Sequence, residues 1–403
     1  MNYMKVKTLN NGLKVIFDQR HTESVTVEVA VKVGSNHENK SIAGISHFLE
    51  HLVFCGTKKR KDAKEIANEV EKLGGELNAA TGNDITYYYV KLPKKHLSVA
   101  LDILSDILLN PLFNETDIKN ERKVLLDEIK MVNDDPRNYQ WVLFQRACFG
   151  GVVGNPVYGS IKTIKSITKK DIVDFYSKYY VPNNFYISIV GGCDVPFDIV
   201  ENYFGDAKRK EVEYPPVVVK PKKNNEIIEV KDILQSYFVF GYPTVQRGHK
   251  DSYAIEVVKG ILGRGQSGIL FDEIRNKRGL AYEVGVHIEQ GEVYGFFAAY
   301  VGTDKKNVEE IRKLLLKEFN KLLSVSEQEV NESKTFLNGS FLINMEDTAK
   351  SASFITSWNI IGKAELSEKY IENIEKVNVE DIKRVIGTYF INPISIILQP
   401  KQS

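Results

Sequence analysis

The chain repeats one pattern near its middle and near its end, and this duplication restricts the folds open to it. Residues 160–191 (SIKTIKSITKKDIVDFYSKYYVPNNFYISIVG) resemble residues 370–398 (YIENIEKVNVEDIKRVIGTYFINPISIIL). One constant offset places Ile164, Ile167, Asp171, Ile172 and Tyr179 opposite Ile374, Val377, Asp381, Ile382 and Tyr389. Each copy predicts a short helix that begins near the aspartate, followed by a strand that closes its half.

Upstream of these copies the two halves share an order of elements. Each half opens with alternating apolar residues typical of a half-buried strand, at Val25, Val27, Val29 and Val31 and again at Tyr237 and Val239. A long helix, a strand pair and two more helices follow. We therefore predict an α+β protein of two homologous domains, each a mainly antiparallel sheet flanked by helices.

The length of 403 residues fits two domains, because one hydrophobic core rarely organises so long a chain. Residues 211–225 (EVEYPPVVVKPKKNN) combine three prolines with lysines and asparagines, a composition typical of an extended linker. We expect an N-terminal domain at 1–212, a linker at 213–225 and a C-terminal homologous domain at 226–403.

Composition excludes several functional classes. An apolar fraction of 43% with 27% charged residues fits a globular protein, and no apolar run approaches the roughly 18 residues of a membrane span. A net charge of +1 gives no reason to expect a nucleic-acid partner. Three widely spaced cysteines fit neither a disulfide framework nor a thiolate zinc site. The N-terminus lacks the pattern of a secretory signal, so we expect a cytoplasmic protein without a membrane partner.

Residues 47–51 (HFLEH) place two of the seven histidines four residues apart. Apolar residues at three- and four-residue spacing around them predict a helix, with Ser41 as its cap and Gly56 as its stop. His47, Glu50 and His51 then leave its polar face, where both imidazoles can reach one ion. The alternative is a helix with an ordinary solvated polar face.

Zinc suits two imidazoles, and a catalytic zinc site keeps one position open for water. A second predicted helix lies in residues 114–136 (NETDIKNERKVLLDEIKMVNDDP), where Glu121 and Glu128 stand two turns apart on one face. One of them can bind zinc while the other accepts a hydrogen bond from a ligand histidine. Two glutamates on a helix are otherwise usually solvated.

HFLEH followed by ERKVLLDE resembles the pitrilysin family of zinc peptidases, which carry an inverted HxxEH motif and include insulin-degrading enzyme and the mitochondrial processing peptidase. The resemblance covers the whole chain, at the length of the shorter dimeric members, whose two related α+β domains form half of a clamshell. It implies one Zn²⁺ per chain, with His47, His51 and Glu128 as ligands. It also implies Glu50 as the general base that activates a zinc-bound water, with Glu121 behind a ligand histidine.

The segment GGELNAATGNDITYYYV (74–90) resembles the family's LNAxT strand, which lines the cleft and to whose edge the substrate adds as an extra strand. The resemblance implies that Asn78 and Ala79 face the peptide, within a substrate-binding stretch of Leu77, Asn78, Ala79, Ala80 and Thr81. Main-chain pairing demands little of the peptide sequence. The same residues also predict a hairpin with a Gly-Asn-Asp turn, whether or not it binds anything.

In the second half, FDEIRNKRGLAYEV (271–284) resembles the family's arginine and tyrosine seven residues apart, here Arg275 and Tyr282. In the family these side chains approach the scissile bond, so the resemblance implies that they are catalytic. Short relatives work as dimers. We therefore expect a homodimer in which Arg275 and Tyr282 complete the partner subunit's site.

Together these features predict a zinc-dependent metalloendopeptidase that hydrolyses peptides or unfolded polypeptide segments. Two alternatives stay open. The chain can be a non-catalytic subunit, although such subunits typically lose a ligand or the base and none is missing here. It can also be a catalytic subunit of an obligate hetero-oligomer that works only with an inactive homologue, as in the mitochondrial processing peptidase.

Overall fold

The computed structural model describes residues 4–401, which form two compact units. The first unit contains the residues up to Ile129 together with Pro156–Pro216 and Ile343–Ser367. The second contains Lys130–Asn155, Val217–Leu342 and the residues from Glu368 onward. Each unit therefore takes one segment from the other half of the sequence.

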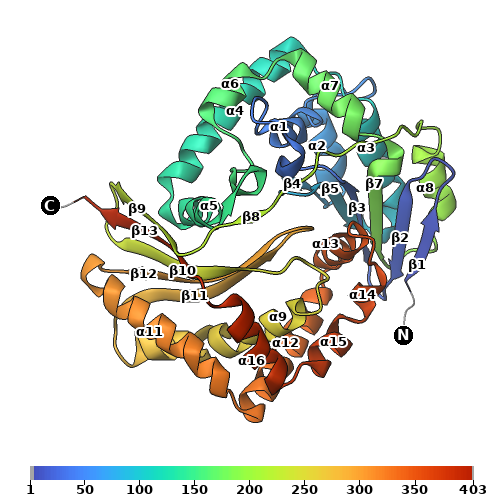
Figure 1. The fold of residues 1–403 in the computed structure, drawn as a ribbon. Helices are drawn as coiled ribbons and strands as arrows, with labels where there is room; N and C mark the ends of the chain where they lie inside the picture. Colours follow the sequence, from blue (N-terminus) through green and yellow to red (C-terminus); the bar gives the residue numbers. More distant parts are fainter. Residues whose placement is uncertain (1–3, 402–403) are drawn as a thin grey trace. The chain divides into compact units, whose positions relative to one another are not determined.

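The first unit is built on a six-stranded sheet (Figure 1). Its spatial order is β1 (Lys5–Thr8), β2 (Lys14–Gln19), β7 (Phe185–Gly191), β3 (Ser24–Val31), β5 (Thr86–Pro93) and β4 (Glu76–Thr81). Strands β2 and β7 are parallel, and the other neighbours are antiparallel. Strand β4 lies at one edge of this sheet.

The second unit is built on a five-stranded sheet with the same topology. Its order is β11 (Ala281–Gln290), β12 (Gly295–Thr303), β10 (Ser236–Thr244), β13 (Ile394–Pro400) and β9 (Asn225–Lys231). Strands β13 and β9 form its parallel pair, as β7 and β2 do in the first sheet. The short strands β6 (Phe149–Gly150) and β8 (Lys220–Pro221) pair separately. The prediction of two homologous, mainly antiparallel α+β domains is confirmed.

Helices flank both sheets. In the first unit they are α1 (Ile45–Leu52), α2 (Ala63–Glu71), α3 (Leu97–Leu109), most of α4 (Glu115–Asp134), α6 (Ile161–Ser166), α7 (Lys169–Tyr179), α8 (Phe197–Phe204), α13 (Thr348–Asn359) and α14 (Glu365–Glu368). In the second they are α5 (Pro136–Cys148), α9 (Ser252–Gly263), α10 (Ile269–Phe271), α11 (Val308–Lys321), most of α12 (Glu327–Met345), α15 (Tyr370–Lys376) and α16 (Val379–Tyr389).

The duplicated helices begin with the same hydrogen bonds. In α7 the N-cap Thr168 accepts a hydrogen bond from the backbone of Asp171, whose carboxylate accepts one from the backbone of Thr168. Asn378 and Asp381 form the same capping box at α16. The repeated aspartate therefore starts a helix in both halves, as the sequence predicts.

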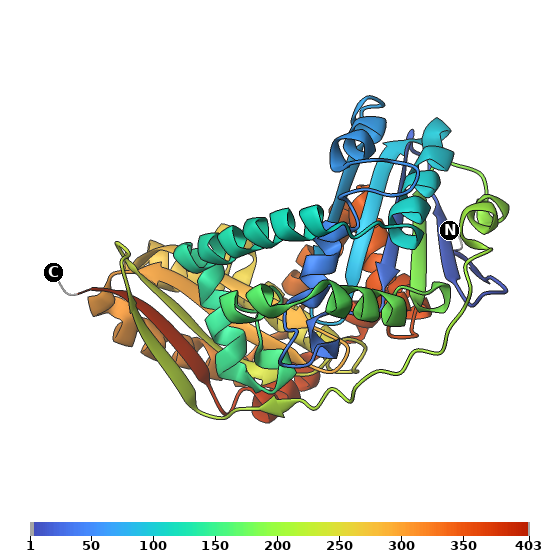
Figure 2. The same ribbon diagram turned by 90° about the horizontal axis from the view of Figure 1, so that it is seen from above.

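The expectation that the first strand of each half is half-buried is wrong. Strand β3 is buried on both faces over nearly its whole length, and so is most of β10. Helix α13 lies against β3 and β7 in the first unit (Figures 1 and 2). Helix α5 packs against β10 and β13 in the second. Both covering helices come from the opposite half of the sequence, so the local pattern could not reveal them.

Two further features agree with the composition. Within residues 4–401 no helix is long and apolar enough to span a lipid bilayer. The three cysteines, Cys55, Cys148 and Cys193, are free thiols.

Candidate active site

Helix α1 carries the HFLEH residues on a short amphipathic segment. Its apolar residues are Ile45, Phe48, Leu49 and Leu52, all buried in the core of the first unit. The helix ends at Leu52, four residues before the stop predicted at Gly56. This burial fixes the helix and leaves its polar side free for chemistry.

The predicted cap, Ser41, is wrong. The N-cap is Gly44, whose φ of 95° lies in the left-handed region and whose missing side chain cannot cap the helix. Glu38 supplies the acceptors instead: its buried carboxylate receives the backbone N–H groups of Gly44 at 2.7 Å and Ser46 at 2.8 Å. Ser41 donates its hydroxyl to Asn39.

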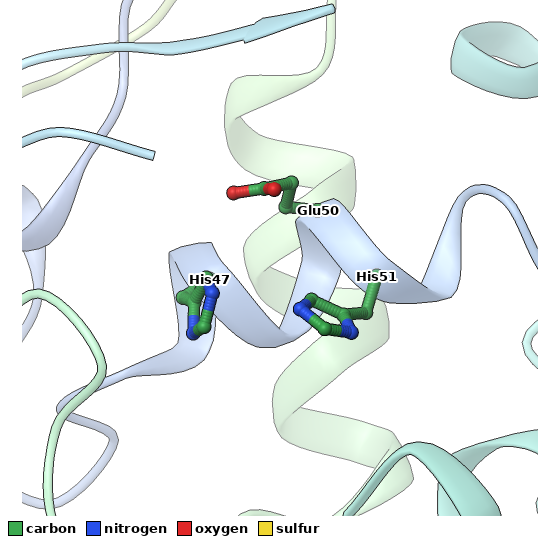
Figure 3. A group of neighbouring side chains, drawn as sticks. All are labelled: His47, Glu50 and His51. Carbon is green, nitrogen blue, oxygen red and sulfur yellow. The ribbon is translucent and has the colours of Figure 1, made fainter. Parts of the chain in front are cut away.

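The two imidazoles of α1 lie together, with ring centroids 4.9 Å apart and ring planes nearly perpendicular. Figure 3 shows both rings beside the helix and the Glu50 carboxylate directed to another side of it. Helix α4 places Glu128 against both rings. Its Oε1 lies 3.7 Å from Nε2 of His47, and its Oε2 lies 3.6 Å from Nε2 of His51. The structure thus brings together the three residues predicted as ligands.

Glu121 contacts the other ring nitrogen of His51, the one that does not face Glu128. Its Oε2 is 3.1 Å from Nδ1 of His51, which leaves Nε2 of that ring turned toward Glu128. A carboxylate in this position fixes the orientation of an imidazole. His47 lacks such support, because its Nδ1 is buried and has no hydrogen-bond partner within residues 4–401.

Glu50 has a separate partner. The hydroxyl of Thr81, the last residue of β4, donates a hydrogen bond to Oε2 of Glu50 at 2.5 Å. Burial raises the pKa of Glu50 above its usual range, although this hydrogen bond and the nearby His51 act in the opposite direction. A carboxyl group with a raised pKa can accept and release a proton closer to neutral pH.

The two histidines differ in their titration. Burial, reinforced by His51, lowers the pKa of His47 to about 4, so its imidazole is neutral at pH 7 and free to bind a metal. Burial also acts to lower the pKa of His51, but its hydrogen bond with Glu121 and the charges of Glu50 and Glu128 leave that pKa raised. A metal ion and a proton would therefore compete for this ring.

The donor atoms fit a zinc ion by their chemistry. Nitrogens of two imidazoles and a carboxylate from a second helix form a set of ligands typical of catalytic zinc. One ligand atom each from His47, Glu50 and His51 also lie within 4.8 Å of one another. Two carboxylates are thus within reach of the imidazoles, and only the Glu50 carboxylate is engaged by Thr81.

Strand β4 contains the predicted substrate-binding residues. It pairs with β5 in register from Glu76 to Thr81 and lies at the edge of its sheet. The side chains of Leu77 and Ala79 pack against the core, while Asn78 is exposed. Because side chains alternate along a strand, Asn78 and Ala79 point to opposite faces of the sheet. At the free edge of β4, both residues therefore present only main-chain groups.

Arg275 and Tyr282 lie in the second compact unit and touch each other. The guanidinium of Arg275 stacks 4.3 Å from the Tyr282 ring centroid, and its Nη1 donates to the Tyr282 carbonyl at 2.8 Å. Tyr282 is 77% exposed. The exposed ring is available to another molecule.

Sequence reasoning missed two functional details. It placed Thr81 in the substrate strand without its bond to Glu50, and it overlooked Glu38. One feature of the sequence could have indicated Glu38. A helix whose N-cap is a glycine needs a hydrogen-bond acceptor from another residue for its first backbone N–H groups. No local sequence signal indicates the contact of Thr81 with Glu50, since these residues are 31 apart in the chain.

Comparisons with known proteins show the family to which this chain belongs. Residues 14–159 match the family model described as Insulinase (Peptidase family M16), and residues 166–337 match the model described as Peptidase M16 inactive domain. The chain belongs to peptidase family M16. The M16 assignment places HFLEH in the peptidase domain, while the inactive-domain match falls largely on the half without HxxEH.

Relatives of this M16 chain carry the same activity in their names. It is 34% identical over 393 residues to an "uncharacterized zinc protease" of Rickettsia felis, covering 96% of this chain and 94% of the relative. It is 30% identical over 396 residues to the "uncharacterized zinc protease YmxG" of Bacillus subtilis, covering 96% of both. A solved protease from Helicobacter pylori is 26% identical, with a TM-score of 0.94, over 99% of this chain and 100% of that one. The predicted pitrilysin-family zinc metalloprotease is confirmed.

Proposed function

We propose that this M16 protein is a zinc-dependent endopeptidase that hydrolyses peptides or unfolded polypeptide segments, with Glu50 as its general base. One observation carries the proposal. Both imidazoles of α1 face Glu128 of α4, at 3.7 and 3.6 Å, while Thr81 engages Glu50. The two nearby carboxylates thus differ in their partners, which suits one ligand and one base.

His47, His51 and Glu128 would hold the zinc ion. Bound zinc supplies Lewis acidity and lowers the pKa of a water molecule in its open position. Glu121 would keep the ring of His51 in the tautomer and orientation that binding requires.

Glu50 does the proton transfer in this proposal. Its carboxylate takes a proton from the attacking water and then delivers it to the nitrogen that leaves the cleaved peptide bond. Burial raises the pKa of Glu50, which makes its carboxylate a stronger base toward the attacking water. Helix α1 carries the Glu50 side chain, and the Thr81 hydroxyl donates a hydrogen bond to its carboxylate.

The edge of β4 would bind the substrate. An edge strand offers unpaired N–H and C=O groups, to which an extended peptide can add as a further strand. Leu77 and Ala79 turn their side chains inward, so they present main chain to the peptide. Recognition through main-chain groups favours unfolded segments of varied sequence over folded proteins.

Arg275 and Tyr282 would act in a homodimer, where each pair completes the partner subunit's site. Arg275 can donate to a substrate carbonyl, and Tyr282 can stabilise the negative charge that develops on it. The exposure of Tyr282 supports such a role. A cytoplasmic location is consistent with three free thiols.

The substitution Glu50→Gln tests the proposal. We expect zinc content, unfolding temperature and peptide affinity to stay unchanged while kcat for an unstructured peptide falls about 100- to 10,000-fold. Glu71→Gln, at an exposed position of α2, serves as the matched control. Undiminished turnover in Glu50→Gln removes Glu50 as the base.

The same assay separates the alternatives. A non-catalytic subunit cleaves no peptide even as the wild-type protein. A subunit of an obligate hetero-oligomer becomes active only when a second, different chain is added. Turnover by the purified wild-type chain excludes both.

A further inference from the structure

Thr81 contacts the general base rather than only the substrate edge. It is the last residue of β4, and its hydroxyl donates to Oε2 of Glu50 at 2.5 Å. We infer that Thr81 is a positioning residue, whose hydroxyl holds the Glu50 carboxylate in the orientation that accepts a proton. This inference rests on the proposed function and deepens it, because it separates one residue of the predicted substrate strand from the others.

Glu50 needs such a partner. The terminal torsion of a glutamate side chain is broad, so neighbouring groups must fix the plane of its carboxylate. A Glu50 oxygen also lies close enough to His47 and His51 to join them as a third ligand atom, with all three within 4.8 Å of one another. A Glu50 that turned toward the imidazoles would compete with Glu128 for the metal and cease to act as a base.

Thr81 is itself held firmly enough to orient another group. It pairs with Thr86 across the β4–β5 hairpin, and Gly82 closes the turn by donating to Ile85 at 2.7 Å. The amide of Asn83 in this turn donates to the Ser35 hydroxyl at 3.0 Å. The hydroxyl of Thr81 therefore projects from an anchored hairpin.

One short segment ties this hairpin to the helix that carries Glu50. In residues 34–38, the backbone N–H of Asn36 donates to the carbonyl of Asn83 in the hairpin turn at 2.8 Å. Two residues later, the Glu38 carboxylate accepts the backbone N–H groups of Gly44 and Ser46 at the start of α1. Residues 34–38 therefore hydrogen-bond both to the hairpin that carries the donor Thr81 and to the helix that carries the acceptor Glu50.

The position of Gly34 shows how close this support lies to the turn. A Cβ atom at Gly34 would lie 2.4 Å from the carbonyl oxygen of Gly82 and 2.7 Å from that of Asn83. Only glycine permits this approach without displacing the turn. The distance between the hairpin turn and residues 34–38 is therefore set by backbone contacts, and the buried Glu38 carboxylate connects these residues to α1.

The experiment compares Thr81→Val with Thr81→Ser. Valine keeps the shape of threonine and loses the hydroxyl, whereas serine keeps the hydroxyl. We expect Thr81→Val to lower kcat about 10- to 100-fold, the usual scale for a misplaced reacting group, with KM within about twofold of wild type. Thr81→Ser should restore kcat to within about threefold of wild type, because the donor returns.

Two measurements do not depend on activity. The affinity of metal-free Thr81→Val for an unstructured peptide should equal that of the metal-free wild type, because strand addition uses main-chain groups. A crystal structure of metal-free Thr81→Val should show the Glu50 carboxylate turned away from its wild-type orientation. Thr81 is only partly buried, so both variants are expected to fold.

Three outcomes overturn the inference. They are a wild-type kcat in Thr81→Val, an unchanged Glu50 orientation in its crystal structure, and a loss of peptide affinity in the metal-free variant, which would make Thr81 a substrate contact. Failure of the proposed function is recognised separately. If Glu50→Gln is as active as wild type, Glu50 is not the base, whereas an inactive Glu50→Gln beside a fully active Thr81→Val refutes only the role of Thr81.

Discussion

Glu28 is a buried acid whose charge should weaken the fold at high pH. It lies in the middle of β3, is 1% exposed and is covered by α13. Its Oε2 accepts the hydroxyl of Ser353 at 2.5 Å, while its Oε1 has no hydrogen-bond partner within residues 4–401. Replacing Glu28 with glutamine keeps the size of the side chain and removes the charge.

The expected magnitude follows from the titration of this group. Burial raises the pKa of Glu28 from 4.5 to about 7, although the hydrogen bond from Ser353 and the nearby hydroxyl of Thr356 act to lower it. Between these two values the folded protein keeps a proton that the unfolded chain has released, so the free energy of unfolding falls as pH rises. At about 1.4 kcal/mol per tenfold change in the equilibrium constant, the full loss is about 3 kcal/mol.

The two tryptophans make the assay selective. Trp358 lies in α13 of the first unit, and Trp141 lies in α5 of the second. In a Trp141→Phe background, Trp358 fluorescence reports unfolding of the unit that contains Glu28. Urea unfolding of the metal-free protein is measured at pH 5 and pH 8. The stability advantage of Glu28→Gln should grow by about 2 to 3 kcal/mol between these values.

Comparison of the two proteins isolates Glu28, since every other titrating group contributes equally to both. Glu23→Gln serves as a control, because it makes the same chemical change at a side chain that is 91% exposed. A Glu28→Gln advantage that is the same at pH 5 and pH 8 would refute the reasoning, since the carboxyl group would then titrate alike in the folded and unfolded chain.

Two further predictions concern the metal and the dimer. Glu121→Gln should weaken zinc affinity about 10-fold or more in a chelator competition, because His51 loses its anionic partner; unchanged affinity would contradict the place of Glu121. Glu50→Gln and Arg275→Ala should each be inactive, yet mixing them with subunit exchange should restore about one quarter of wild-type activity, because half of the dimers gain one intact site. No recovery would exclude completion of the site by the partner.

Local signals in the sequence predicted the parts of the site that depend on one helix at a time. The four-residue spacing of His47 and His51 places both rings on one side of α1, and the seven-residue spacing of Glu121 and Glu128 does the same on α4. Asp171 likewise starts its helix where the repeat predicts. These features follow from helical geometry, which neighbouring residues determine.

Contacts between segments that are distant in the chain could not be predicted from the sequence pattern. The cap of α1 comes from Glu38 instead of the adjacent Ser41, because a loop folds back over the helix start. Thr81 reaches Glu50 only because the β4 hairpin lies beside α1. The pattern of a single sequence does not show which distant segments meet, so such contacts become visible only in the folded structure.

The two helices that cross between the sequence halves cover their sheets by different means. In the second unit α5 uses aromatic packing: Trp141 and Phe144 lie against Phe296 of β12, with centroids 6.4 and 5.3 Å from it. Such contacts depend on shape and tolerate small shifts, because dispersion and burial are not directional.

Helix α13 packs Ala352 and Ile355 against Val190 of β7, and it also meets β3 and β7 through paired hydroxyl groups. Thr348 lies 2.8 Å from Thr26, and Thr356 donates to Ser188 at 2.8 Å, all of them buried. A hydrogen bond adds only about 1 kcal/mol net, but leaving a buried hydroxyl unpaired costs about 1 to 3 kcal/mol. Sliding α13 by one residue would break both pairs at once. The polar contacts therefore fix the register of a helix that arrives from the far end of the chain, more than they add to stability.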